Sequence, residues 1–217
     1  MIDFNAINDL IAPHGLAVRG GFHPGPDEGL PGQPATIVLI GHLGRSMWPA
    51  FQRARIEETH PLDRWAKRII DGVAQRLEVT ALYPFQGPPY WPFQRWAMRA
   101  EGLAQSPIGP LIHPDYGLWH GYRGALAFSL RLDLPAVAPS DPCAACADKP
   151  CLTACPVSAL ALGRYDVPAC VAHLRTDGND CLGGGCLARH ACPIGRAHAY
   201  VPDEGGFHTR AFLKAMD

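Results

Sequence analysis

The stretch CAACADKPCLTACPVSAL (residues 143–160) places four cysteines within thirteen residues, in the pattern C-x2-C-x4-C-x3-C-P. A second, looser group follows in the pattern C-x10-C-x4-C-x5-C-P and ends in the segment CPIGRA. The eight cysteines all lie in the last 75 residues: Cys143, Cys146, Cys151, Cys155, Cys170, Cys181, Cys186 and Cys192. The C-terminal part of the chain therefore carries the strongest chemical signal.

Eight cysteines can form disulfides, bind zinc or hold iron–sulfur clusters. The opening segment MIDFNAINDLIAPHGLAVRG has no cationic leader, and no stretch approaches the roughly 18 apolar residues that a membrane span needs. We therefore expect a cytoplasmic protein without a membrane partner, whose thiols stay reduced. Structural zinc usually takes paired C-x2-C knuckles. The first group instead differs from the bacterial ferredoxin run C-x2-C-x2-C-x3-C-P only in its middle gap. Iron–sulfur clusters are favoured over zinc, and zinc over disulfides.

The two Cys-Pro endings predict how the cysteines are shared. In two-cluster ferredoxins the fourth cysteine of each group ligates the other cluster, and proline suits the first position of the helix that follows. We expect two 4Fe–4S clusters, one of them held by Cys143, Cys146, Cys151 and Cys192. The other would be held by Cys155, Cys170, Cys181 and Cys186. His190, inside the last loop, is a possible substitute ligand, and the amides of Gly183–Gly185 could approach the sulfides.

Composition narrows the class of protein. The chain has 217 residues, of which 47% are hydrophobic and 18% charged, and its net charge is −1. These values are typical of a globular protein. Because there is no excess of basic residues to meet phosphates, we expect no nucleic-acid partner.

The cysteine-free part of the chain predicts a separate domain. The segment LDLPAVAPSDP (residues 132–142) looks like a linker, so we expect one domain at residues 1–138 and another at 139–217. Strands and helices alternate in the first domain, which predicts an α+β fold. The expected strands are residues 16–22, 35–43, 78–84 and a final pair at 109–117 and 123–132. The expected helices are residues 4–12, 47–55, 60–77, 92–104 and 205–217.

Two segments are rich in aromatic residues. YPFQGPPYWPFQRW (residues 83–96) has four prolines and six aromatics, and IHPDYGLWHGYRG (residues 112–124) adds histidines and an arginine. Two explanations fit this composition equally well. The prolines can order a long loop that the aromatic side chains anchor, or the aromatic side chains can form a wall for a planar ligand.

Parts of the chain resemble known families. GPLIHPDYGLWHGYRGALAF followed by LDLPAVAP resembles cyanocobalamin reductase, the cobalamin-processing chaperone. The cysteine region, with ACVAHLRT around its solitary cysteine, resembles the tail of epoxyqueuosine reductase and its reductive-dehalogenase relatives. The resemblance implies a flavin-reductase-like mixed α/β domain that cradles a corrinoid, followed by a two-cluster ferredoxin-like domain. It implies cobalamin as a further cofactor, with its corrin face lined by Tyr90, Trp91, His113, Tyr116 and Trp119.

The chain also departs from epoxyqueuosine reductases. YPFQGPPYWP has no acidic residue where those enzymes carry a VDS-like segment, SPIGPLIHP replaces their Gly-Lys turn, and their terminal helical repeats are absent. We therefore assign no catalytic proton donor and do not expect epoxyqueuosine reduction. Three functions stay open. They are a corrinoid-linked reductase, a ferredoxin-type electron carrier that docks a redox partner protein, and a binding module in which the metal is a structural staple.

Overall fold

A computed structural model describes residues 3–216, which divide into two compact units. The first unit runs to Gly102 and resumes at His120–Pro139, and the second consists of Leu103–Trp119 and the chain from Ser140 onward. The structure departs from the expected division at residue 138 in one segment. Leu103–Trp119 packs with the cysteine region, whereas the sequence predicts that it belongs to the first domain. The apolar side chains of Ile112 and Leu118 are buried there against Cys192. The outermost residues of the two expected domains, 1, 2 and 217, lie outside the described part.

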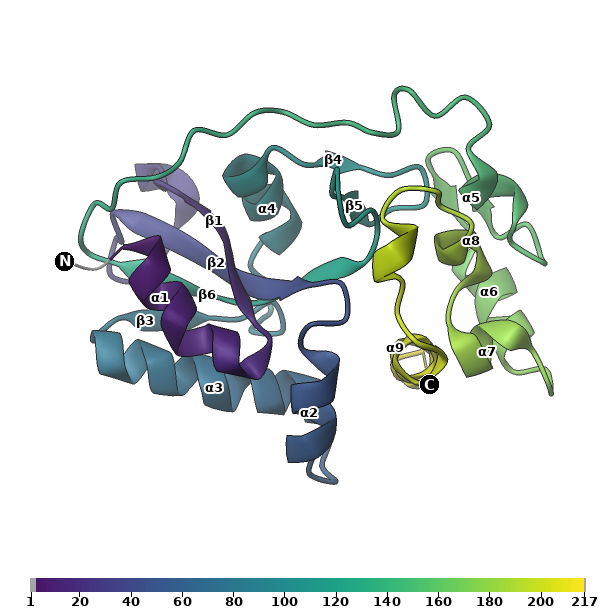
Figure 1. The fold of residues 1–217 in the computed structure, drawn as a ribbon, viewed down its shortest axis with the longest axis horizontal. Helices are drawn as coiled ribbons and strands as arrows, with labels where there is room; N and C mark the ends of the chain where they lie inside the picture. Colours follow the sequence, from purple (N-terminus) through teal and green to yellow (C-terminus); the bar gives the residue numbers. More distant parts are fainter. Residues whose placement is uncertain (1–2, 217) are drawn as a thin grey trace. The chain divides into compact units, whose positions relative to one another are not determined.

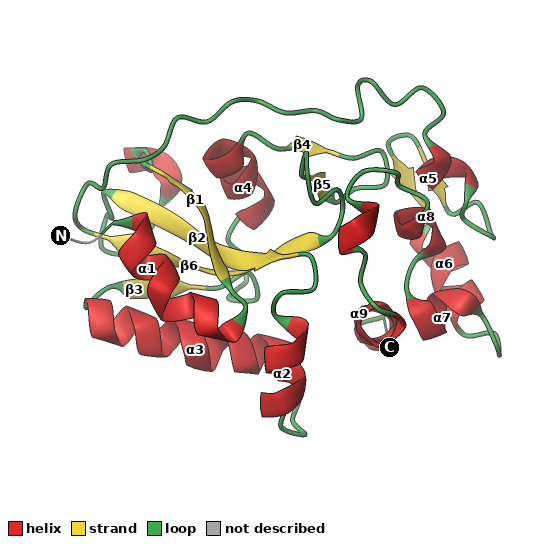
Figure 2. Ribbon diagram, viewed as in Figure 1, coloured by secondary structure: helices red, strands yellow, loops and turns green. Residues whose placement is uncertain are grey.

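The first unit is built on a four-stranded antiparallel sheet in the order β1-β2-β6-β3 (Figure 2). Its strands are β1 (Ala17–Phe22), β2 (Thr36–Leu43), β3 (Thr80–Leu82) and β6 (His120–Phe128). All of β2 except its last residue is buried, as its continuous apolar run TIVLI predicts for a central strand that is covered on both faces. The expected mixed α/β class is confirmed.

Helices cover both faces of this sheet. They are α1 (Phe4–Ile11), α2 (Trp48–Ala54), α3 (Pro61–Leu77) and α4 (Phe93–Glu101), with short 3-10 turns at Ala12–His14 and Pro26–Glu28. Figure 1 shows α1 and α3 on one face and α4 on the other. In α3 the buried residues Trp65, Ile70 and Val73 recur at helical spacing, as the sequence predicts. The helix ends where Glu78 adopts a left-handed conformation.

The expected final strand pair is wrong. β5 (Leu111–Ile112) pairs with β4 (Ala104–Gln105), whereas β6 pairs with β2 and β3. The reason is a tight turn between the two segments. His113 and Gly117 exchange N–H···O bonds of 2.8 and 2.9 Å, and Gly117 has the positive φ of +57° that such a turn requires. The chain thus turns back at the end of β5, which keeps this strand short.

A buried ion pair joins β1 to the end of α4 in the first unit. Arg19 is only 1% exposed, and its Nε and Nη2 atoms each donate to a Glu101 carboxylate oxygen at 2.8 Å. Its Nη1 donates to the backbone oxygen of His42 at 2.9 Å, and Tyr122 donates its hydroxyl to Glu101. Arg19 lies where the β1–β2 register shifts, so a bulge in β1 helps to turn its side chain toward α4.

The second unit consists of short elements. Its helices are α5 (Pro150–Thr153), α6 (Val167–Leu174), α7 (Asp180–Gly184), α8 (Leu187–His190) and α9 (Pro202–Lys214), with a 3-10 turn at Arg196–His198. A hairpin is formed by β7 (Leu160–Ala161) and β8 (Arg164–Tyr165). Asp166 caps α6 and Asn179 caps α7, each by accepting a backbone N–H bond. Units with so few regular elements commonly rely on metals or cross-links for stability. Among residues 3–216 no helix is both long and apolar enough to cross a membrane.

Candidate metal centres

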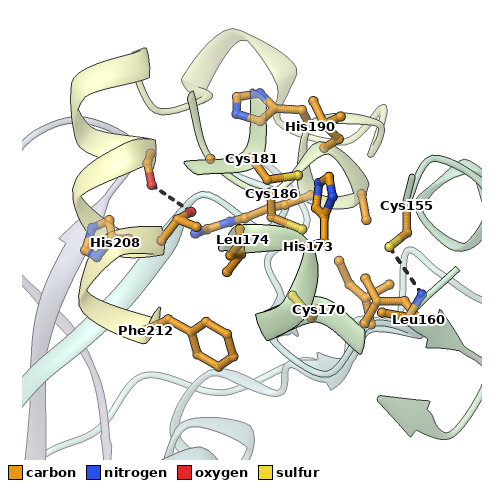
Figure 3. A pocket seen from close by; sticks show the side chains of 18 of the residues that line it. Cys155, Leu160, Cys170, His173, Leu174, Cys181, Cys186, His190, His208 and Phe212 are labelled. Atoms are coloured by element: carbon orange, nitrogen blue, oxygen red, sulfur yellow. Dashed lines mark hydrogen bonds between the residues drawn. The ribbon is translucent and has the colours of Figure 1, made fainter. Parts of the chain in front are cut away.

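Four cysteines line one cavity of about 260 Å³ in the second unit (Figure 3). Cys155 follows α5, Cys170 lies in α6, Cys181 in α7, and Cys186 directly precedes α8. These four form the set that the spacing predicts for one of the two clusters. The structure thus brings together residues that are up to 31 positions apart, since 186 − 155 = 31.

Backbone N–H groups point at three of these sulfurs. The amide of Ala159 lies 3.3 Å from Cys155 Sγ. Amides of the turn Leu187–Arg189 donate to the sulfurs of Cys181 and Cys186. Donors of this kind stabilise negative charge on thiolate sulfur and are one of the means by which a protein adjusts a cluster's reduction potential. The backbone amides therefore offset part of the cost of placing charge on these sulfurs, although burial still raises the pKa of Cys181 and Cys186.

The rest of the cavity wall is mainly apolar and aromatic. It includes Leu160, Leu174, Trp119, Tyr200 and Phe212, together with the histidines His173, His190 and His208. Trp119 is 1% exposed, with its ring centroid 4.7 Å from that of His190 and its indole under the guanidinium of Arg189. His190, the expected substitute ligand, has a backbone partner, because its Nε2 lies 3.2 Å from the Gly184 oxygen. Such a wall limits the access of water to the buried thiol of Cys181, whereas Cys186 is exposed.

Helix α9 forms one side of the cavity and packs on α7 through glycines. His208 and Phe212 extend from α9 in Figure 3. A Cβ atom at Gly205 would lie 2.2 Å from the Gly184 oxygen, and one at Gly206 would lie 2.4 Å from the Gly183 oxygen. These distances are far below van der Waals contact, so the two backbones approach as closely as glycine alone permits. The glycines expected to approach the sulfides thus also have a packing role.

Gly205→Ala is expected to lower the stability of the second unit by about 1–3 kcal/mol, because the added methyl overlaps a backbone oxygen that cannot move independently. The matched control is Gly183→Ala. It adds the same methyl where nothing lies within 4 Å and should leave stability unchanged or raise it by up to about 1 kcal/mol. Urea denaturation of anaerobic protein, followed by absorbance and circular dichroism, measures both. Equal midpoints for the two variants would contradict the assigned contact.

The other four cysteines also lie near one another. Burial raises the pKa of Cys143 to about 11, and Asp141 and the neighbouring thiols add to the shift; these neighbours are Cys192, Cys151 and Cys146. Amides of Leu152 and Ile194 donate to the sulfurs of Cys151 and Cys192. Nearby, Lys149 donates its ammonium to the Cys146 backbone oxygen at 2.8 Å. The second predicted ligand set is thus also assembled within the second unit.

The state of the eight thiols determines what the binding of metal would require. The eight cysteines are free thiols. Among residues 3–216 no three His, Cys, Asp or Glu side chains are arranged to hold one metal ion. A cubane cluster takes one thiolate at each of four irons, so its sulfur ligands stand farther apart than those of a zinc ion. Burial raises the pKa of Cys181 and Cys192, so metal loading must release their protons.

The five residues expected at a corrin face are divided between the units. Tyr90 and Trp91 lie in the loop between β3 and α4 of the first unit, where Tyr90 is 64% exposed and Trp91 stacks on Trp96 at 5.9 Å. His113, Tyr116 and Trp119 belong to the second unit. Neither unit by itself brings the five side chains together.

Three of these residues have evident local partners in the second unit. His113 Nδ1 accepts the backbone N–H groups of Asp115 and Tyr116, at 3.1 and 3.2 Å, and so shapes the turn. The ring of Tyr116 packs 4.3 Å from that of His198. Trp119 forms part of the cysteine cavity wall. The sequence did not indicate this last position, because it depends on contacts with residues about 70 positions away.

Comparison with solved structures shows that epoxyqueuosine reductases have a similar fold. The Bacillus subtilis enzyme, with its catalytic loop swung out of the active site, gives a TM-score of 0.52 at 16% identity over 86% of this chain and 62% of that one. The Streptococcus thermophilus enzyme gives 0.50 at 16% identity over 88% and 65%. A third structure, with an epoxyqueuosine-modified tRNA-Tyr stem loop, gives 0.53 at 16% identity over 86% and 62%. The chain thus spans less than two thirds of each.

The tRNA complex conflicts with our expectation about nucleic acid. That expectation came from the net charge of −1, which sums over the whole chain and does not describe any local surface. A protein of the same fold binds an RNA stem loop, so net charge alone is not a sound basis for excluding this class of partner.

The comparisons with family models and with curated proteins found no match. The structural likeness is consistent with the epoxyqueuosine-reductase part of the resemblance seen in the cysteine region. At 16% identity it establishes the fold alone, which this chain shares with epoxyqueuosine reductases over most of its length.

Proposed function

We propose that this protein is an iron–sulfur redox protein with two 4Fe–4S clusters in a ferredoxin-like second unit. One cluster would be held by Cys155, Cys170, Cys181 and Cys186, and the other by Cys143, Cys146, Cys151 and Cys192. The observation that carries the proposal is the single cavity lined by the first four of these thiols. The shared fold with reductases supports a redox role over a purely structural one.

The residues of the chain have distinct parts in this function. When bound, such clusters supply one-electron transfer. The cysteines would hold the metal, the amides of Ala159 and Leu187–Arg189 would stabilise negative charge on sulfur, and the wall around Trp119 would shield the buried thiol of Cys181 from water. Cys151 of one set lies in the short helix α5 (Pro150–Thr153), and only residues 152–154 separate it from Cys155 of the other set. This spacing gives the two proposed sites a short covalent connection.

We propose a corrinoid as the electron acceptor, in a first unit of the flavin-reductase-like kind. This step rests on the sequence resemblance and on the exposed Tyr90 and the half-buried Trp91, which line a hollow of about 450 Å³ in the first unit. Exposed aromatics are typical of surfaces that bind flat ligands. The alternative acceptor is a partner enzyme, which would make this chain a ferredoxin-type electron carrier.

The Bacillus subtilis structure carries an aspartate in its catalytic loop, whereas the aromatic loop at residues 83–96 has no acidic residue. A carboxyl group that can donate or accept a proton is therefore missing from this loop. We do not extend epoxyqueuosine reduction to this chain.

Anaerobically purified protein is expected to contain about eight irons per chain and to show a broad visible absorbance that dithionite bleaches. The same sample is titrated with hydroxocobalamin. A saturable shift in the corrin bands, followed by reduction of cobalt on adding dithionite, supports the corrinoid acceptor. Bleaching without any corrin shift supports the electron-carrier alternative. Bound zinc, or metal that dithionite does not reduce, would contradict a redox function altogether.

A further inference from the structure

Tyr165 lines the cysteine cavity, although it is not one of the predicted metal ligands. It is the last residue of β8 and precedes Asp166, the cap of α6, so its position is set by both the hairpin and the helix. Its side chain is 44% exposed and lines the cavity together with Cys170, and its hydroxyl is within hydrogen-bonding reach of that thiol. Its hydroxyl also lies within electrostatic range of Cys155 and Cys186. Tyr165 therefore faces several of the four thiols.

The ring of Tyr165 is held in place by α9. It stacks against Phe212, with centroids 6.3 Å apart and an interplanar angle of 28°. Tyr165 also lines a second, more open hollow together with Cys143 and Arg164. The ring is thus part of the wall between the cysteine cavity and a solvent-facing surface.

Each sulfur of this set then has a hydrogen-bond donor. Backbone amides donate to the sulfurs of Cys155, Cys181 and Cys186, and the phenol of Tyr165 donates to that of Cys170. A phenol with an ordinary pKa near 10 is protonated at neutral pH, so its hydroxyl donates to the sulfur. Bonds to a charged acceptor are about twice as strong as neutral ones and strengthen as the acceptor gains negative charge.

We propose that Tyr165 is a positioning residue that raises the reduction potential of the cluster held by Cys155, Cys170, Cys181 and Cys186. The inference rests on the proposed function and concerns this one site. A reduced cluster carries one more negative charge than an oxidised one, and hydrogen bonds to the sulfurs favour the more negative state. The donated O–H bond stabilises the reduced form more than the oxidised form.

The test is Tyr165→Phe in the full-length anaerobic holoprotein. Phenylalanine keeps the ring, its stacking on Phe212 and its place in the cavity wall, and removes only the donor. The reduction equilibrium constant of one cluster should fall roughly tenfold, which for a one-electron couple is a negative shift of about 59 mV. The other cluster should keep its wild-type potential, and the iron content should not change. Redox titration followed by electron paramagnetic resonance and absorbance measures these quantities.

The matched control is Tyr83→Phe, which removes a hydroxyl bonded to Asp71 in the first unit and should shift neither potential. Site-specific 3-fluorotyrosine at position 165 keeps the side-chain shape, and its more acidic hydroxyl is a stronger donor. It should shift the same potential upward, even if the phenylalanine variant loads poorly. Wild-type potentials in loaded Tyr165→Phe, or an unmoved potential with fluorotyrosine, would overturn the role of Tyr165. A wild-type protein without redox-active iron would instead refute the proposed function.

Discussion

Replacing Cys155 with serine is expected to remove one cluster and about half of the iron, while the other cluster stays intact. The expectation follows from the cavity, where Cys155 lies with Cys170, Cys181 and Cys186 although it belongs to the other cysteine group in sequence. A serine hydroxyl is a far weaker ligand for iron than a thiolate. The cluster that is lost should be the one whose potential depends on Tyr165.

Double variants separate this pairing from the simplest competing one, in which each sequence group holds its own cluster. Under the proposed pairing, Cys155→Ser combined with Cys170→Ser removes no more iron than either change alone, because both act on one site. Combining Cys155→Ser with Cys151→Ser should remove nearly all of it. Under the competing pairing these two results are exchanged. Iron and sulfide analysis after anaerobic reconstitution measures them, and Ala154→Ser is the adjacent control that should retain full iron.

The sequence could predict the grouping of the cysteines because ferredoxin-type spacing follows from cluster geometry. The same information could not reveal Tyr165. Its hairpin strands β7 and β8 have two residues each, which is too short for any periodic pattern. Its contact with Phe212 spans 47 positions (212 − 165 = 47) and depends on how α9 packs through glycines. Local spacing thus predicted which thiols lie together, whereas the surroundings of those thiols depend on tertiary packing.

The same contrast holds for the first unit. β2 and α3 could be predicted because an apolar run and a helical repeat each extend over several residues. The strand pairing of β6 could not, because its partners are distant in sequence: Thr36 pairs with Phe128, 92 positions later (128 − 36 = 92). Arg19 was expected only as part of a strand. Charged residues are almost never fully buried, and its partner Glu101 is 82 positions away.

Arg19→Met is expected to lower the free energy of unfolding of the first unit by about 3–5 kcal/mol, the usual cost of removing one partner of a buried ion pair. The guanidinium makes two 2.8 Å bonds to Glu101 and one to the backbone of His42. Methionine fills a similar volume but satisfies neither acceptor. The Glu101 carboxylate would keep Tyr122 as a donor and lose its counter-charge. Urea denaturation measured by circular dichroism and tryptophan fluorescence gives the change.

The surface pair Lys67–Asp71 is the matched control. Its atoms lie 2.6 Å apart, but both side chains are exposed, so Lys67→Met should change stability by less than about 1 kcal/mol. The double variant Arg19→Met with Glu101→Met should lose less free energy of unfolding than the two single variants lose together. The difference should be about 0.5–3 kcal/mol, because the double variant leaves no buried charge unpaired. Additive losses, or an Arg19→Met effect as small as that of Lys67→Met, would show that the pair is not the buried, coupled unit described. A coupled result would show that the two charges act as one unit that joins α4 to β1. The aromatic loop that precedes α4 would then be held in place through Glu101, at the opposite end of the same helix.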